Sequence, residues 1–217
     1  DRQCVNNETT IYAVYNRFVE TGRIDAFKFD WRPGSPKEPH IFWESDVAKW
    51  MEAASYIYQK NQDTRLVEII DEIVDQIEKN QLEDGYFNIY YTLIEPENKW
   101  QIRTGHELYC AGHLMEAAVA YYHATGKDKF LKLMCKYADY IEQVFVKEKS
   151  AGFITPGHEE IELALIRLFH ATGERRYLDL SRYFLDNRGK DNPSTYYSYA
   201  NAKYSQDHAP VRMQDTA

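Results

Sequence analysis

Two stretches of the chain repeat the same beginning and the same end around an apolar helical pattern. The beginning is Gly-His-Glu, at 105–107 and again at 157–159, and the end is His-Ala-Thr-Gly, at 123–126 and again at 170–173. Between them, apolar residues recur with the spacing of one face of an α-helix. A chain that repeats both a polar helix start and a helix end is constrained to a helical repeat whose polar groups gather at one mouth.

Three helical hairpins follow from this repeat. Segments that begin at Glu52, Glu116 and Glu162 align with one another, and each is followed by a short polar turn and a second apolar-striped helix. The pattern predicts helices over 9–21, 45–60, 63–80, 106–125, 128–146, 158–172 and 174–187. Loops with a Gly-aromatic pair follow two of the second helices, so long loops lie at one end of the hairpins and short turns at the other.

The predicted fold is all-α. An open solenoid and a closed α/α toroid both fit a row of helical hairpins. The long, aromatic, histidine-bearing loops favour the toroid, because its mouth is a natural pocket. A closed (α/α)6 toroid needs about twelve helices and the pattern supplies about seven. We therefore expect residues 1–217 to form a single domain that is about half of such a barrel.

The segments between the helices carry weaker signals. Three prolines and a glycine predict a loop over 30–40. Aromatic and β-branched residues over 87–93 predict a short extended segment. Residues 190–207 are polar and rich in tyrosine, and we expect them to form a long loop at the same mouth.

The composition is that of a globular protein with an acidic balance. Hydrophobic residues make up 44% of the chain and charged residues 28%, and the formal net charge is −8. This charge argues against nucleic acid or an anionic membrane as the partner, and no apolar run is long enough to span a bilayer. No signal peptide is visible, so we expect a cytoplasmic location, with a processed N-terminus before Asp1 as the alternative.

One candidate metal site lies along the helix over 106–125. His106, Cys110 and His113 are spaced so that they share one helical face, which is a spacing typical of metal ligands. The histidines do not have the His-Glu-x-x-His register of a zinc protease. The alternative is that Cys110 packs as a small buried residue and His113 bonds locally. The spacing alone leaves both interpretations open.

The repeated Gly-His-Glu motif predicts a pocket at the mouth of the helices. A carboxylate in the first turn, such as Glu107, is favoured by the helix dipole, so capping alone would explain it. The same field favours neutral His106 and His158, and a neutral imidazole is a good hydrogen-bond partner for sugar hydroxyls. The repetition favours the pocket over capping. Gly112-His113 is an alternative partner for the second motif.

Aromatic residues could contribute to such a pocket. The chain holds 18 tyrosines, and flat aromatic faces suit carbohydrate sites, although packing between helices explains them equally well. Tyr86 and Trp100 are candidate stacking platforms, with loop anchoring as the alternative. Asp84, which precedes Gly85, is expected to be a turn residue.

Several of these motifs together resemble a known family. They are the segments 45–54, 84–86, 106–118, 156–165 and 208–214, which run in order along the chain. Their sequences are similar to the β-L-arabinofuranosidases of glycoside hydrolase family 127. The resemblance implies an (α/α)6 barrel catalytic domain, followed by β-sandwich domains in full-length members. It also implies a retaining hydrolase that releases terminal β-L-arabinofuranosides from plant glycans.

The resemblance implies a zinc-dependent chemistry as well. Family members use a cysteine thiolate as the nucleophile, held on zinc with other cysteines and a glutamate, and a second glutamate is the general acid. Such chemistry is physically sensible, because zinc keeps the sulfur deprotonated. These positions lie beyond residue 217 of this chain. Cys4, Cys110 and Cys135 match none of them, so we expect no zinc ligand within the sequence.

The resemblance assigns one wall of the substrate pocket to this chain. His106, Glu107, His158 and His208 match pocket-lining positions, and Met213 stands where members often have a glutamate. We therefore expect a carbohydrate partner but no hydrolysis by these 217 residues alone.

Two alternatives to this enzyme fragment are a non-catalytic carbohydrate-binding module and a helical scaffold. Half a toroid also exposes an apolar seam, which predicts homodimers or aggregates.

Overall fold

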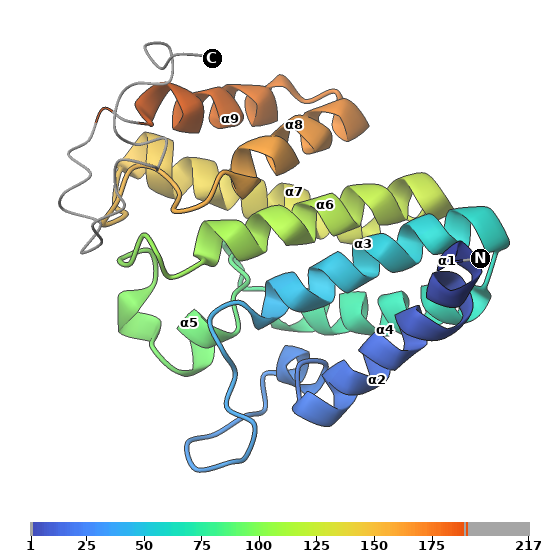
Figure 1. Cartoon of the computed structure of the whole chain (residues 1–217). Helices are drawn as coiled ribbons and strands as arrows, with labels where there is room; N and C mark the ends of the chain where they lie inside the picture. Colours follow the sequence, from blue (N-terminus) through green and yellow to red (C-terminus); the bar gives the residue numbers. More distant parts are fainter. Residues whose placement is uncertain (1, 189, 191–217) are drawn as a thin grey trace.

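The structure, a computed structural model, describes residues 2–188 and 190, and all regular elements in that part are helical (Figure 1). The first helices are α1 (Arg2–Val5), a π-helical turn (Asn6–Thr10), α2 (Ile11–Thr21) and a 3₁₀ turn (Asp25–Lys28). They are followed by α3 (Trp43–Asn61), α4 (Thr64–Asn80), α5 (Tyr90–Leu93) and a 3₁₀ turn (Pro96–Asn98). The last are α6 (Glu107–Thr125), α7 (Lys129–Glu142) with a π-helical extension (Gln143–Glu148), α8 (Glu160–Thr172) and α9 (Arg175–Asn187). The all-α prediction is confirmed.

The helices form two layers, and each hairpin contributes one helix to each layer. α6 packs between α3 and α8, and these three helices form one layer. α4, α7 and α9 are their hairpin partners, and α4 also contacts α7 in the second layer. The long loops before α6 and α8 lie at one end, on the left of Figure 1, and the short turns within the hairpins lie at the other. The three hairpins expected from the repeat are therefore confirmed.

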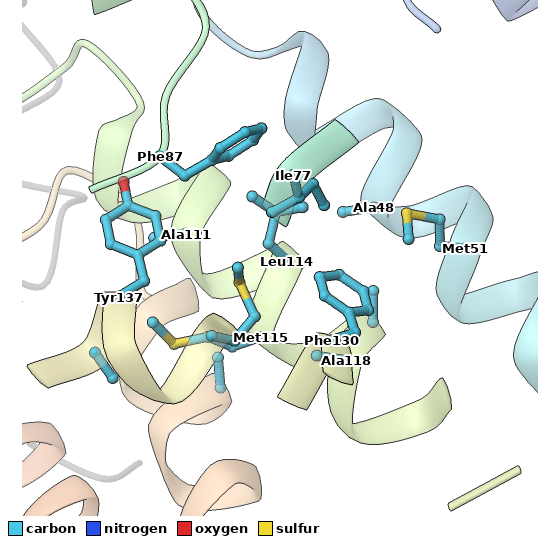
Figure 2. Packing of buried hydrophobic residues seen from close by; sticks show 14 of the residues in the cluster. Ala48, Met51, Ile77, Phe87, Ala111, Leu114, Met115, Ala118, Phe130 and Tyr137 are labelled. Carbon is cyan, nitrogen blue, oxygen red and sulfur yellow. The ribbon is translucent and has the colours of Figure 1, made fainter. Parts of the chain in front are cut away.

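The core fills the space between the two layers. Figure 2 shows Met51 of α3, Ile77 of α4, Leu114 and Met115 of α6, and Phe130 of α7, which belong to one buried cluster. α6 is buried nearly all round, because it has neighbours on three sides. Its many alanines let those neighbours approach closely.

The repeated His-Ala-Thr-Gly sequence is a helix C-terminus. Gly126 and Gly173 follow α6 and α8 in the left-handed conformation, with φ of 75° and 76°. In both copies the preceding threonine, Thr125 or Thr172, donates its hydroxyl to the carbonyl four residues back and accepts the backbone N–H two residues on. The repeat in the sequence therefore reflects one capping geometry used twice.

Two local predictions are corrected by the structure. The segment predicted to be extended over 87–93 instead contains α5, because Asn88 accepts the N–H of Tyr91 at 2.8 Å and starts a helical turn. α3 begins at Trp43, two residues before the predicted start of the helix at residue 45. The loop predicted over 30–40 contains no helix or strand, as expected. The loop predicted over 190–207 lies outside the described residues, apart from position 190.

No helix in the described part of the chain is long and apolar enough to cross a bilayer.

Candidate functional site

The backbone at His106 is strained. His106 directly precedes α6 and has φ of 66°, in the left-handed region that non-glycine residues seldom adopt. The preceding residue is Gly105, and Tyr91 packs so closely against it that a Cβ there would lie 2.1 Å from the Tyr91 hydroxyl oxygen. Strain of this kind is concentrated at functional sites, because the surrounding structure must hold it in place.

The two repeated histidines meet. His106 comes from the start of α6 and His158 from the loop before α8, and their Nε2 atoms are 3.3 Å apart. A hydrogen bond between two Nε2 atoms requires one of them to donate and the other to accept. Burial, followed by the proximity of His158, lowers the pKa of His106, so its neutral form is favoured. The geometry therefore pairs His106 with His158, as the repeat predicts.

The loops that carry these histidines are tied to each other. Arg103 is buried, and its guanidinium donates to the carbonyls of Thr155 and Pro156 at 2.8 Å each. The N–H of Gly152 donates to the Trp100 carbonyl, also at 2.8 Å. Hydrogen bonds thus join two loops about fifty residues apart, the loop before His106 and the loop that carries His158. Sequence reasoning missed Arg103, since no local pattern marks it.

Tyr109 forms an aromatic surface beside the histidines. Its ring lies 5.6 Å from the ring of His106 and 4.9 Å from that of His158, centroid to centroid. Lys49 lies on the neighbouring α3, and its Nζ donates a hydrogen bond of 2.8 Å to the Tyr109 hydroxyl. Sequence reasoning missed both residues, although Tyr109 lies three residues after His106 and so on the same helical face.

Glu107 points away from this surface. Its side chain is buried, and its two carboxylate oxygens accept the Tyr86 hydroxyl at 2.6 Å and the Trp100 N–H at 2.7 Å. Burial raises the pKa of Glu107 to about 7, although both hydrogen bonds act in the other direction. A direct contact between Glu107 and a substrate stays a prediction, and the carboxylate here anchors the loop before His106. Tyr86 and Trp100 are buried as well, so they are loop anchors.

The candidate metal face of His106, Cys110 and His113 does not form one site. Cys110 is buried, its Sγ lies 3.5 Å from the Ile41 carbonyl oxygen, and burial raises the pKa of its thiol well above the usual value. The Nδ1 of His113 instead lies 3.0 Å from a carboxylate oxygen of Glu160. Cys110 therefore packs as the alternative interpretation predicted, whereas His113 contacts Glu160 of α8 rather than bonding locally.

The cysteine-rich zinc site implied by the family resemblance does not fit the described residues either. Cys4 is exposed, Cys110 is buried, and Cys135 is partly buried on another helix. The described group with metal-like spacing is His113, Glu116 and Glu160, and it contains no cysteine. No catalytic step is therefore assigned to zinc on these residues.

The remaining candidates lie elsewhere. His208 lies outside the described residues, so its place in the pocket stays a prediction. A groove of about 840 Å³ lies between α3 and the helical segments at the start of the chain, and its surface is mainly apolar. It reaches the histidine surface only through Lys49 and lacks both repeated histidines, so we do not assign it to the sugar.

Comparison with known proteins gives one family. The model of the "Beta-L-arabinofuranosidase, GH127 catalytic domain" family matches residues 1–217. The non-reducing end β-L-arabinofuranosidase of Bifidobacterium longum subsp. longum is 37% identical over 230 aligned positions. That alignment covers 95% of this chain and 33% of the relative.

Solved structures agree with this result. A GH127 β-L-arabinofuranosidase from Geobacillus stearothermophilus T6 superposes with a TM-score of 0.85 at 38% identity, over 95% of this chain and 36% of that one. The GH127 β-arabinofuranosidase BT3674 gives 0.84 at 35% identity, over 99% and 34%. The helical hairpins therefore match part of an (α/α)6 barrel. The chain spans about a third of the length of these relatives.

Proposed function

The chain belongs to the GH127 β-L-arabinofuranosidase catalytic-domain family, and from this premise we propose that it forms one wall of the sugar-binding site of an arabinofuranosidase. The substrate would be a glycan with a terminal β-L-arabinofuranoside, the sugar in the names of the relatives. The observation that carries the proposal is the contact between His106 and His158 at the mouth of two helical repeats.

The physical properties of this surface suit a sugar. A neutral imidazole offers one donor and one acceptor, which matches the hydroxyl groups of a furanose. Tyr109 adds an aromatic face on which the apolar face of the ring can lie. The exposed Lys49 adds a cation within hydrogen-bond distance of the Tyr109 hydroxyl. Together these groups can bind and orient a ring without taking part in bond cleavage.

The proposed role of this chain is therefore positioning. Binding energy that holds the sugar in one orientation lowers the barrier of a reaction carried out by other groups. We assign neither the nucleophile nor the general acid of a retaining hydrolase to a described residue around the histidine pair. We propose that the complete enzyme supplies them from the rest of its catalytic domain.

We expect the purified chain to bind L-arabinose weakly, and we expect no turnover of nitrophenyl β-L-arabinofuranoside. The His158→Ala variant should bind about three- to tenfold more weakly, since one hydrogen bond to a ligand contributes about 0.5–1.5 kcal/mol. His170→Ala is the matched control, because His170 is an exposed histidine at the far end of α8. Calorimetric titration of the three proteins measures the affinities.

The outcomes separate the three classes of function. Turnover by the chain would show that the reactive groups lie within these residues, against the proposal. Binding without turnover in the complete protein would support a carbohydrate-binding module. If neither the wild type nor His158→Ala shows detectable affinity for L-arabinose, the helical scaffold is supported.

A further inference from the structure

A cluster of three titratable side chains lies behind the histidine pair. The first turn of α8 contributes Glu160, and α6 contributes His113 and Glu116. The Nδ1 of His113 lies 3.0 Å from Glu160 Oε1 and 3.9 Å from Glu116 Oε2. One ligand atom of each residue lies within 4.8 Å of the others, and all three side chains are largely buried.

The two carboxyl groups of this cluster cannot both be ionised at low cost. Like charges that share a buried site push one proton onto the pair. Arg167 decides which group stays charged, because its Nε lies 3.1 Å from Glu116 and its guanidinium also contacts Glu52 at 2.9 Å. In the described part of the chain no guanidinium is paired with Glu160 in this way, so the proton belongs on Glu160. Burial, followed by the charge of Glu116, raises the pKa of Glu160 to about 8.

The other groups around Glu160 agree with this assignment. From α3, Glu52 favours the proton on Glu160 and Lys49 opposes it, but the Lys49 ammonium is already within 2.8 Å of the Tyr109 hydroxyl. From α6, burial lowers the pKa of His113 to about 4, so His113 is neutral and supplies no positive charge.

The position of Glu160 is also fixed by its backbone. α8 approaches α6 at Gly112, where a Cβ would lie 2.7 Å from Glu160 Cγ and 3.2 Å from Ile161 Cα. Glu160 follows His158 by two residues, so the orientation of the first turn of α8 sets where His158 lies. The ring of Tyr109 lies between the buried cluster and the histidine pair. Its centroid is 4.5 Å from the ring centroid of His113 and 4.9 Å from that of His158.

We propose that Glu160 is a positioning residue of the sugar site: its acid proton, shared with Glu116, holds the first turn of α8 against α6 and keeps His158 beside His106. This inference rests on the proposed function for its meaning, since His158 is taken to contact the sugar. Above about pH 8 the proton is lost. Two facing carboxylates then repel, and the histidine pair separates.

A bound cation is the competing explanation for such a cluster. His113, Glu116 and Glu160 have ligand-like spacing, and a metal would keep both carboxylates ionised. Arg167 opposes this explanation, because its guanidinium already supplies a positive charge at 3.1 Å from Glu116. A proton satisfies the pair without adding a second cation.

The test follows Glu160 by NMR without any sugar. In the wild type, the carboxyl carbon of Glu160 should titrate near pH 8, and the backbone amide of Ile161 should shift at the same midpoint. Glu160→Gln keeps a neutral donor, so its Ile161 amide should show no alkaline step. Glu159→Gln should retain the step, because Glu159 faces Arg188 at 3.3 Å instead.

Sugar affinity is then measured separately. Between about pH 7 and 9.5 the wild type should lose affinity for L-arabinose at least about threefold, the equivalent of one hydrogen bond, while Glu160→Gln should change less.

Three results would overturn the proposal: titration of Glu160 near its ordinary range, the same alkaline step in Glu160→Gln, or 1:1 binding of Zn²⁺ by the wild type that Glu160→Gln lacks. If Glu160 titrates near pH 8 but no sugar binds, only the proposed function is refuted.

Discussion

Replacement of Gly112 by alanine is expected to destabilise the fold by up to about 2 kcal/mol, because an overpacked interface usually costs about 1–3 kcal/mol and the better helix propensity of alanine offsets part of that cost. A Cβ at this position would lie 2.7 Å from Glu160 Cγ and 3.2 Å from the backbone of Ile161. Alanine is a better helix former than glycine by about 1 kcal/mol. If α6 and α8 did not approach closely, the substitution would therefore stabilise the protein. The sign of the change in unfolding free energy thus shows whether α8 packs against α6 at Gly112.

Thermal and urea unfolding measure this effect, and each 1 kcal/mol corresponds to about 2–4 °C for a chain of this size. Gly126→Ala is a useful comparison, because no described atom outside the adjoining residues lies within 4 Å of its added Cβ, but its φ is 75°. The stability of that variant measures the cost of a left-handed backbone for alanine without a clash of the added methyl group. A Gly112→Ala protein more stable than the wild type would show that α8 does not approach α6 as described.

Glu107→Ala is expected to cost about 2–4 kcal/mol of folding free energy. The substitution leaves two buried donors without an acceptor, the Tyr86 hydroxyl and the Trp100 N–H, and each unsatisfied group costs about 1–3 kcal/mol. Tyr86→Phe is the matched control. It removes one donor together with its need for an acceptor, so it should cost less. Equal stability of Glu107→Ala and the wild type would contradict the anchoring role.

The same carboxyl group makes stability depend on pH. Burial raises the folded-state pKa of Glu107 to about 7, so the folded protein holds a proton that the unfolded chain releases above about pH 4.5. Its contribution is complete below about pH 4.5 and is lost as the pH rises towards 7, by up to about 3 kcal/mol. Glu107→Gln lacks this group. Between pH 5 and 8 the wild type should therefore lose more stability than the variant in urea unfolding.

Much of the architecture could be predicted from the sequence, because apolar spacing and glycine caps are local signals. The repeated His-Ala-Thr-Gly sequence predicted two helix ends, and both are present at Gly126 and Gly173. The prediction of an extended segment over 87–93 was wrong. It was based on the aromatic and β-branched residues there, whereas the side chain of Asn88 accepts the backbone N–H of Tyr91 and a helical turn forms. A single side-chain hydrogen bond outweighed the residue preferences of a short segment.

The site was only partly predictable for a related reason. The repeat of Gly-His-Glu indicated that His106 and His158 share a mouth, and they are in contact. The direction of Glu107 could not be predicted, because it depends on the left-handed turn at His106 and on partners 7 and 21 residues away. Lys49 and Arg103 act across helices and loops, and such contacts have no sequence pattern of their own.

We expect His106 and His158 to contact the sugar together. Histidine ring NMR of the labelled protein, titrated with methyl β-L-arabinofuranoside, measures this contact. The ring signals of His106 and His158 should shift together and saturate with one dissociation constant. The signals of His123 and His170, exposed at the opposite ends of α6 and α8, should stay unchanged. Saturable shifts confined to His123 or His170, or no shift of the His106–His158 pair, would contradict it.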